Sequence, residues 1–73
     1  MPITPFLRGQ VFEAEIVAAM GAALAAVCDA LGLLDRTDKF TEVVAERIID
    51  LAQQGIHDAT ALTAMVLKEF KPD

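Results

Sequence analysis

The feature that most constrains the fold is the stretch IVAAMGAALAAVC, which spans residues 16–28 and carries no charged side chain. Glu15 precedes it and Asp29 follows it. A membrane-spanning helix needs about 20 predominantly apolar residues, whereas a run of about 10–14 is more often a buried helix. No Lys or Arg stands immediately beside the stretch to orient it in a bilayer. We therefore expect a helix of a soluble protein and no membrane span.

The length of the chain predicts one small domain that needs help from a partner. With 73 residues, its core is expected to supply about 3–5 kcal/mol at most. The single cysteine, Cys28, excludes an intrachain disulfide, and the single histidine, His57, disfavours a Cys/His zinc site. Oligomerisation is the remaining way to stabilise such a domain, so we expect a homodimer.

The hydrophobic pattern has the period of a helix along most of the chain and predicts an all-α protein. We expect a three-helix bundle over residues 12–73, preceded by an extended N-terminal arm over residues 1–11. The helices are expected at about residues 12–31, 38–54 and 59–70. The short connections between them make the helices neighbours in space.

Four residues are expected to mark the ends of these helices. Gly32 and Gly55 suit the position after the first and the second helix, because glycine readily adopts a left-handed conformation. Thr37 and Asp58 are expected to cap the starts of the second and the third helix.

One face of each helix is expected to be buried. The expected core positions are Ile16, Met20, Leu24, Val27 and Leu31, then Phe40, Val44, Ile48 and Leu51, and finally Leu62, Met65, Val66 and Phe70. The stripe on the second helix is wide enough for two neighbours. Thr60, Ala64 and Lys68 are expected to face water.

The opposite side of the first helix consists of small residues and has few charges to hold it in water. Gly21 and Ala25 form a pair of small residues four apart, which lets helix backbones approach closely. A glycine within a helix costs roughly 0.5–1 kcal/mol relative to alanine, and close packing would explain it. We predict contact with a second copy of the chain, although a helix of the same chain could also cross there. The candidate interface consists of Ala18, Gly21, Ala22, Ala25, Ala26, Phe6 and Leu7.

No set of residues predicts catalysis or a bound cofactor, so we expect a non-enzymatic protein. Cys28 lies at the edge of the apolar arc, where burial raises the pKa of a thiol and leaves it inert. His57 could act as a general base oriented by Asp58. However, Asp58 is expected to cap a helix and no nucleophile is placed nearby.

No metal site is expected either. Asp35, Asp38 and Glu42 lack the glycine and the ligand alternation of a calcium-binding loop. Turn and capping roles explain these carboxylates better.

Net charge and composition limit the partners. The formal net charge of −5 disfavours nucleic acid, because attraction to phosphate supplies most of that affinity. An unpaired cysteine and the lack of a recognisable export signal lead us to expect the cytoplasm. Two alternatives to a protein–protein contact role remain. One is an acidic regulator similar to a helix-turn-helix protein, and the other is a helical carrier of an apolar ligand held beside Met20 and Met65.

Two strings in the sequence resemble a group of short uncharacterised bacterial proteins. The first runs Met-Gly-x-Ala, then a cysteine, then Leu-Gly-Leu-x-Asp-Arg, and ends at Arg36. The second is of the type Val-Ala-x-x-Ile-Ile-x-Leu-Ala-Gln-x-Gly and ends at Gly55. The resemblance covers about two thirds of the chain and implies no activity, because none is assigned to the group. The matching residues are Met20, Gly21, Ala23, Cys28, Leu31, Gly32, Leu33, Asp35, Arg36, Val44, Ala45, Ile48, Ile49, Leu51, Ala52, Gln53 and Gly55.

Overall fold

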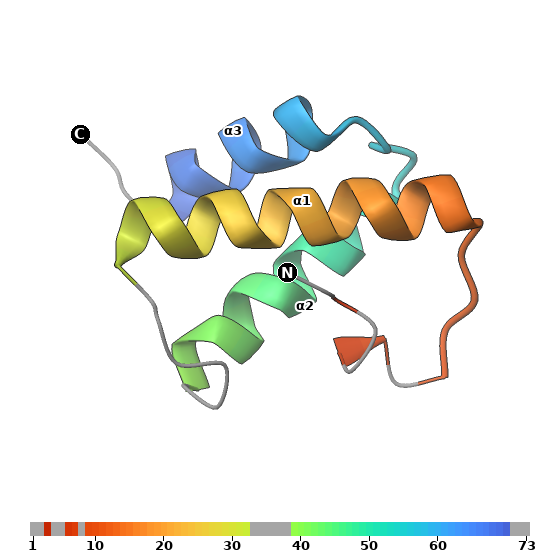
Figure 1. Cartoon of the computed structure of the whole chain (residues 1–73), viewed down its shortest axis with the longest axis horizontal. Coiled ribbons are helices and arrows are strands. Elements are labelled where there is room, and N and C mark those ends of the chain that lie inside the picture. Colours follow the sequence, from red (N-terminus) through yellow and green to blue (C-terminus); the bar gives the residue numbers. More distant parts are fainter. Residues whose placement is uncertain (1–2, 4–5, 8, 33–38, 71–73) are drawn as a thin grey trace.

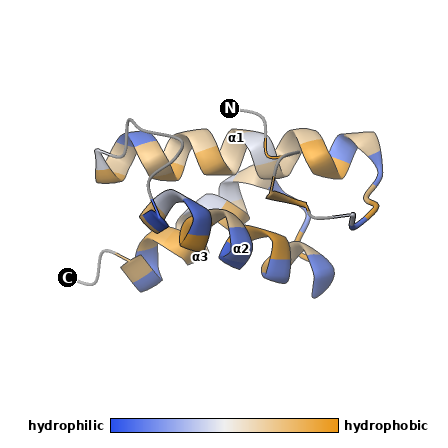
Figure 2. Ribbon diagram, turned by 90° about the horizontal axis from the view of Figure 1, so that it is seen from below, coloured by the Kyte–Doolittle hydropathy of each residue, from blue (hydrophilic) through white to orange (hydrophobic). Residues whose placement is uncertain are grey.

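The computed structural model describes residue 3 and residues 6–7, 9–32 and 39–70. Three helices form within them, α1 (Ala14–Leu31), α2 (Lys39–Gln53) and α3 (Ala59–Phe70), and these residues contain no strand. Figure 1 shows that α1 and α3 run in the same direction. The helix between them in the sequence, α2, runs roughly the opposite way. In Figure 2, α1 forms one layer above α2 and α3. The expected all-α helical bundle is confirmed.

The glycines after α1 and α2 end these helices as expected. Gly32 has φ 73° and follows α1 directly. Gly55 has φ 103° and closes α2 with two backbone hydrogen bonds, from its own N–H to the carbonyl of Ala52 and from the N–H of Ile56 to the carbonyl of Leu51. This is the Schellman arrangement, which satisfies carbonyls that the helix end leaves open.

The helix starts differ slightly from the expected positions. α1 begins two residues later than expected, at Ala14, because extended Glu13 stands at its N-cap and makes no side-chain capping bond. Asp58 caps α3 as expected, since its Oδ2 accepts a hydrogen bond from the N–H of Ala61 at 3.0 Å. Thr37 lies outside the described residues.

The core lies where the three helices meet. Its buried members include Met20, Leu24 and Val27 from α1, Val44, Ile48 and Leu51 from α2, and Leu62 and Val66 from α3. Ile16, Leu31 and Phe70 pack against it while remaining partly exposed. Expected core positions are thus confirmed for the centre of every helix.

Two expected core residues lie at the surface. Met65 is 40% exposed because α3 buries only a narrow stripe, Leu62 and Val66, and Met65 lies to one side of that stripe. Phe40 is 44% exposed, although its ring packs edge-on against that of Phe70 with centroids 5.4 Å apart. Phe40 stands in the first turn of α2, at the margin of the bundle.

The described residues of the N-terminal segment pack on the core of their own chain, so the expected extended arm is not confirmed. Ile3 is fully buried and Leu7 is 8% exposed. The N–H of Phe6 donates to the carbonyl of Ile3 at 2.9 Å, and the N–H of Gln10 donates to the carbonyl of Leu7 at 3.0 Å. Three short helices leave apolar surface uncovered, and the two turns of this segment place Ile3 and Leu7 over it.

Candidate functional site

A groove runs between α1 and α3 and has almost no charged lining. We call it the α1/α3 groove. It is lined by Ala22 and Ala26 from α1 and by Ala59, Thr60, Thr63, Ala64 and Leu67 from α3, and it has a volume of about 500 Å³. It exists because these side chains are too small to fill the space between the two helices. The hydroxyl of Thr63 donates to the carbonyl of Ala59 at 2.7 Å, so its polar group is satisfied within α3.

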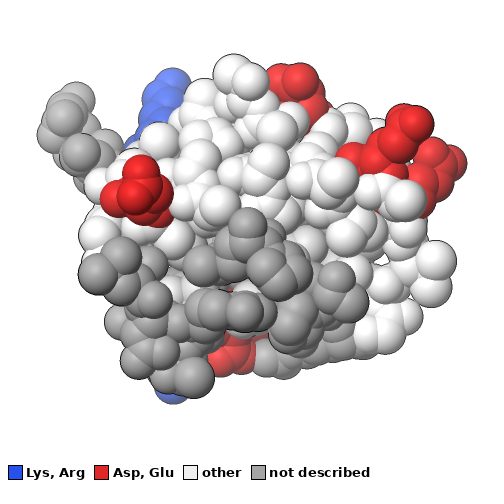
Figure 3. Space-filling view, viewed as in Figure 1, with Lys and Arg blue, Asp and Glu red and all other residues white. Residues whose placement is uncertain are grey.

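The groove continues onto the outer side of α1. Ala18, Ala22 and Ala26 are exposed on this side. Figure 2 shows α1 coloured as apolar along its outer side, with hydrophilic residues towards its ends. The upper part of Figure 3, where described residues are visible, is mostly uncharged and has acidic and basic side chains at its margins. Contiguous uncharged surface of this kind is a candidate contact surface.

Two carboxylates bound the apolar stripe of α1. Glu15 and Asp29 are both exposed, and each lies seven residues from Ala22. Seven residues turn a helix by about 700°, only about 20° short of two full turns, so all three side chains lie on one stripe. The α1 face is therefore apolar in the middle and acidic at both ends.

The structure separates the predicted interface residues into two groups. Ala18, Ala22, Ala26 and the half-buried Ala25 lie on or beside the exposed side of α1. Gly21 is buried within the chain, so its small size serves the packing of the domain itself. The contribution of α3 to the groove was not predicted from the sequence. Its signal is a row of alanine and threonine residues, spaced three and four apart, that begins beside Leu62 and Val66 on the helix surface.

The two predicted interface residues of the N-terminal segment face their own chain. Leu7 is a core residue, and Phe6 is partly buried against the core. Neither presents a free apolar side chain of the kind that an exposed arm would offer.

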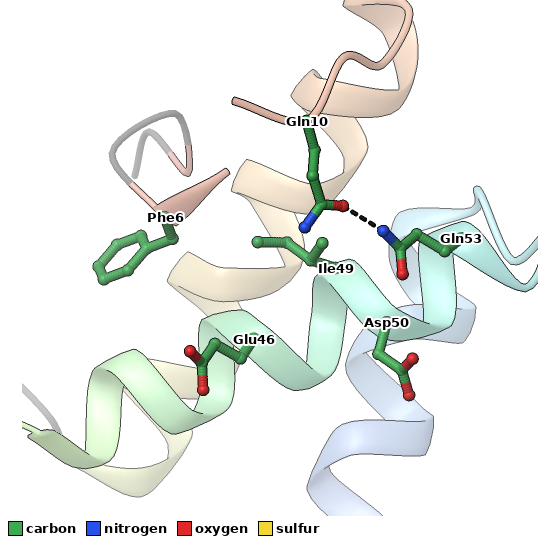
Figure 4. Close-up of a pocket in the computed structure, with 6 residues that line it drawn as sticks. All are labelled: Phe6, Gln10, Glu46, Ile49, Asp50 and Gln53. Carbon is green, nitrogen blue, oxygen red and sulfur yellow. Dashed lines mark hydrogen bonds between the residues drawn. The ribbon is translucent and has the colours of Figure 1, made fainter. Parts of the chain in front are cut away.

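A second, smaller pocket of about 230 Å³ lies between the N-terminal segment and α2 (Figure 4). Phe6 and Ile49 give it apolar walls, and Gln53 donates an amide hydrogen bond to Gln10 across it. The carboxylate of Asp50 at its edge accepts from Arg47 and, at 3.2 Å, from Gln54. The hydrogen bonds of Gln10, Asp50 and Gln53 thus serve contacts within the chain, and no described Ser, Thr, Cys, Lys or His lines the pocket. Glu46 completes the lining.

An ion pair joins α2 to α3 and was not predicted. Nε of Arg47 donates to Glu69 at 2.9 Å from Oε2 and 3.1 Å from Oε1. The hydrogen bond that Arg47 donates to the carboxylate of Glu69 raises the pKa of Arg47 above its usual value. Lys68 is the one cation among the described residues of α3, so this helix presents no row of basic side chains there of the kind that contacts phosphates.

The sequence offers four further residues as candidates for catalysis or metal binding, namely His57, Glu42, Asp35 and Asp38. His57 is exposed in the loop after α2, and its Nε2 lies 3.1 Å from the carbonyl oxygen of Ala52. Glu42 lies in the first turn of α2, where the helix dipole stabilises a carboxylate. Asp35 and Asp38 lie outside the described residues. No group of three His, Cys, Asp or Glu residues in the described part of the chain could hold a metal ion.

The two methionines proposed for a ligand pocket do not share an interior cavity. Met20 is fully buried, whereas Met65 is 40% exposed. The alternative of an apolar ligand carrier stays a prediction, without an enclosed cavity shared by these two methionines to support it.

Cys28 lies in the core beside Thr41, the buried polar residue of α2. Burial raises the pKa of the Cys28 thiol, and a hydrogen bond with the Thr41 side chain acts in the opposite direction with a smaller effect. The thiol is therefore protonated and shielded at neutral pH, as the sequence predicted.

We expect native Cys28 to react with a thiol reagent about two orders of magnitude more slowly than in denaturant, because reaction requires opening of the domain. Because the pKa of the Cys28 thiol is raised in the folded protein, the folded state keeps this proton up to a higher pH than the unfolded state does. Its contribution to stability is present below the pKa of the unfolded thiol, about 8.5, and is lost as the pH rises through the folded pKa. Stopped-flow labelling between neutral and alkaline pH measures both effects. Equal rates in native buffer and in denaturant would contradict the structural role.

One helix of the described chain has the length and composition of a membrane span. α1 has a hydropathy of 1.8 over 18 residues, and 33% of them are buried in the domain. A core helix of a soluble protein passes the same test, so composition alone leaves both kinds of environment open.

The fold and the groove define a small all-α bundle with an uncharged face. No protein-family model, no curated protein and no solved structure matches the chain. The resemblance to the group of short bacterial proteins therefore stays a prediction.

Proposed function

We propose that the protein is a non-enzymatic, cytoplasmic homodimer that works through protein–protein contact and that uses the α1/α3 groove as its interface. The observation that supports this most is the exposed alanine stripe of α1 beside a groove of about 500 Å³. Helices approach closely where their contact residues are small, and such a face gains stability when a partner removes it from water.

The size of the domain supports the same proposal. A chain of 73 residues has a small core, and a partner chain is the one stabilising device that its composition leaves open. A standard interface buries about 800 Å² of each partner. This area is a little under one fifth of the 4402 Å² surface of the chain, so covering one face is sufficient.

We expect Ala22→Leu and Ala26→Leu to weaken the dimer about ten- to a hundredfold. Both positions are exposed in the single chain, so the domain keeps its fold while the larger side chain holds two copies apart. Overpacking of a close contact costs about 1–3 kcal/mol, which corresponds to one to two decades in a dissociation constant. Sedimentation equilibrium over about 1–500 µM measures the constant, a range chosen for a small interface.

Ala14→Leu serves as the matched control, because Ala14 is an exposed residue of α1 that does not line the groove. It should leave the dissociation constant within about twofold of the original. A wild-type chain that stays monomeric throughout this range refutes the homodimer. A chain that needs detergent to remain in solution supports a membrane role for α1 instead.

A further inference from the structure

The ends of the α1/α3 groove restrict how two copies can meet, and this inference rests on the proposed homodimer. Figures 1 and 2 both place the carboxyl ends of α1 and α3 at the same end of the molecule. Asp29 is exposed near that end of α1, and Lys68 is exposed near that end of α3. Neither forms an ion pair with a described residue of its own chain. One end of the groove therefore carries a carboxylate on one wall and an ammonium group on the other.

A twofold axis perpendicular to α1 would bring like charges together. It places α1 antiparallel to α1 of the partner. With Ala22 at the crossing, Glu15 of each copy then faces the partner's Asp29, because both carboxylates lie seven residues from Ala22 on the same stripe. Two such contacts between like charges oppose this arrangement.

A twofold axis parallel to the helices gives the opposite result. It places α1 of one copy over α3 of the other with both helices running the same way. The aspartate at the end of α1 then meets the lysine at the end of the partner's α3, and symmetry makes the contact twice. Counting back along both helices in that register sets the partner's Asp58 opposite Ala19, one helical turn from Glu15 and not directly against it. Charge complementarity therefore selects this axis.

We propose that a second copy docks in the α1/α3 groove about a twofold axis parallel to the helices, with α1 of each copy over the partner's α3 and Asp29 beside the partner's Lys68. The small residues of both helices allow the close approach, and the two ion pairs at the ends set the orientation. Charged contacts at the rim of an interface act in this way, fixing register and excluding other arrangements.

The test uses charge reversal at the two positions, read by native mass spectrometry and sedimentation. D29K alone and K68D alone each turn two attractive contacts into two repulsive ones, and each is expected to weaken the homodimer about tenfold. An equimolar mixture of the two variants is expected to form mainly the heterodimer, in which both contacts are attractive again. About 1 M NaCl, where the Debye length is about 3 Å, should largely remove these differences.

K39D is the matched control, because it makes the same change of charge as K68D at an exposed position at the start of α2. It should leave the homodimer within about twofold of the wild type. If D29K instead strengthens the homodimer, the antiparallel α1 arrangement holds and this geometry is wrong while the homodimer stands. If the wild type dimerises and neither reversal nor their mixture has an effect, the interface lies elsewhere and the geometry is again wrong. A monomeric wild type overturns the proposed function and this geometry together.

Discussion

Ile3→Ala is expected to lower the free energy of unfolding by about 2–4 kcal/mol, although the residue lies outside the three helices. Ile3 is fully buried and belongs to the same core cluster as the central residues of the helices. Removing three carbon atoms there loses hydrophobic transfer energy and leaves a cavity that the neighbours fill only in part. In a domain of about 3–5 kcal/mol, this loss is most of the stability. Urea unfolding followed by far-UV circular dichroism measures it.

Val11→Ala provides the control for this prediction. Val11 lies in the same part of the chain but is 95% exposed, so its truncation should change the unfolding free energy by less than about 0.5 kcal/mol. If Ile3→Ala has an effect as small as that of Val11→Ala, the N-terminal segment does not pack on the core, and the extended arm predicted from the sequence is correct after all.

Leu24→Ala is expected to lower the free energy of unfolding by about 2–5 kcal/mol and to leave little folded protein at room temperature. Leu24 is fully buried in the middle of α1, where it belongs to the common core with α2 and α3. Thermal unfolding in aqueous buffer, with the helix signal as the readout, measures the loss. The result also distinguishes a core helix of a soluble domain from a membrane-spanning helix, because a helix that crosses a bilayer would not unfold together with α2 and α3.

Met65→Ala provides the comparison for Leu24→Ala. Met65 is 40% exposed, and alanine has the higher helix propensity, so this truncation should cost less than about 1 kcal/mol. Similar losses at the two positions would show that burial in the structure does not describe the core of the protein in solution.

Helix positions and much of the core could be predicted because they depend on local signals. Gly32, Gly55 and Asp58 act where the sequence indicates, since glycine conformation and capping are decided within a few residues. Leu24 and Ile48 follow from the helical period. These inferences need no knowledge of how the helices are arranged.

The failures concern positions whose environment is set by residues far away in the chain. The prolines of residues 1–11 suggested an arm, and only the assembled helices show the apolar surface that Ile3 and Leu7 cover. Met65 matched the helical period, but α3 buries too narrow a stripe to include it. Gly21 was read as part of the contact surface of α1 because a sequence cannot tell which side of a small-residue seam another helix will occupy.

The α1/α3 groove could likewise be predicted only in part, because its second wall depends on how the helices pack. Alanine and threonine on α3 carry a weak signal, and the groove appears only when α1 lies beside them. The alanine stripe of α1 could be identified from the sequence, whereas the second wall of the groove required the packing.

The hydrogen bond between Gln10 and Gln53 bears on the rate at which the domain forms. It connects residues 43 positions apart, while most other contacts that define the helices are local. Closing a loop of that length costs conformational entropy before the contact can stabilise the domain. The N-terminal segment therefore adds contacts of long sequence separation to a helical bundle, and such contacts slow folding relative to a bundle held together by local contacts alone.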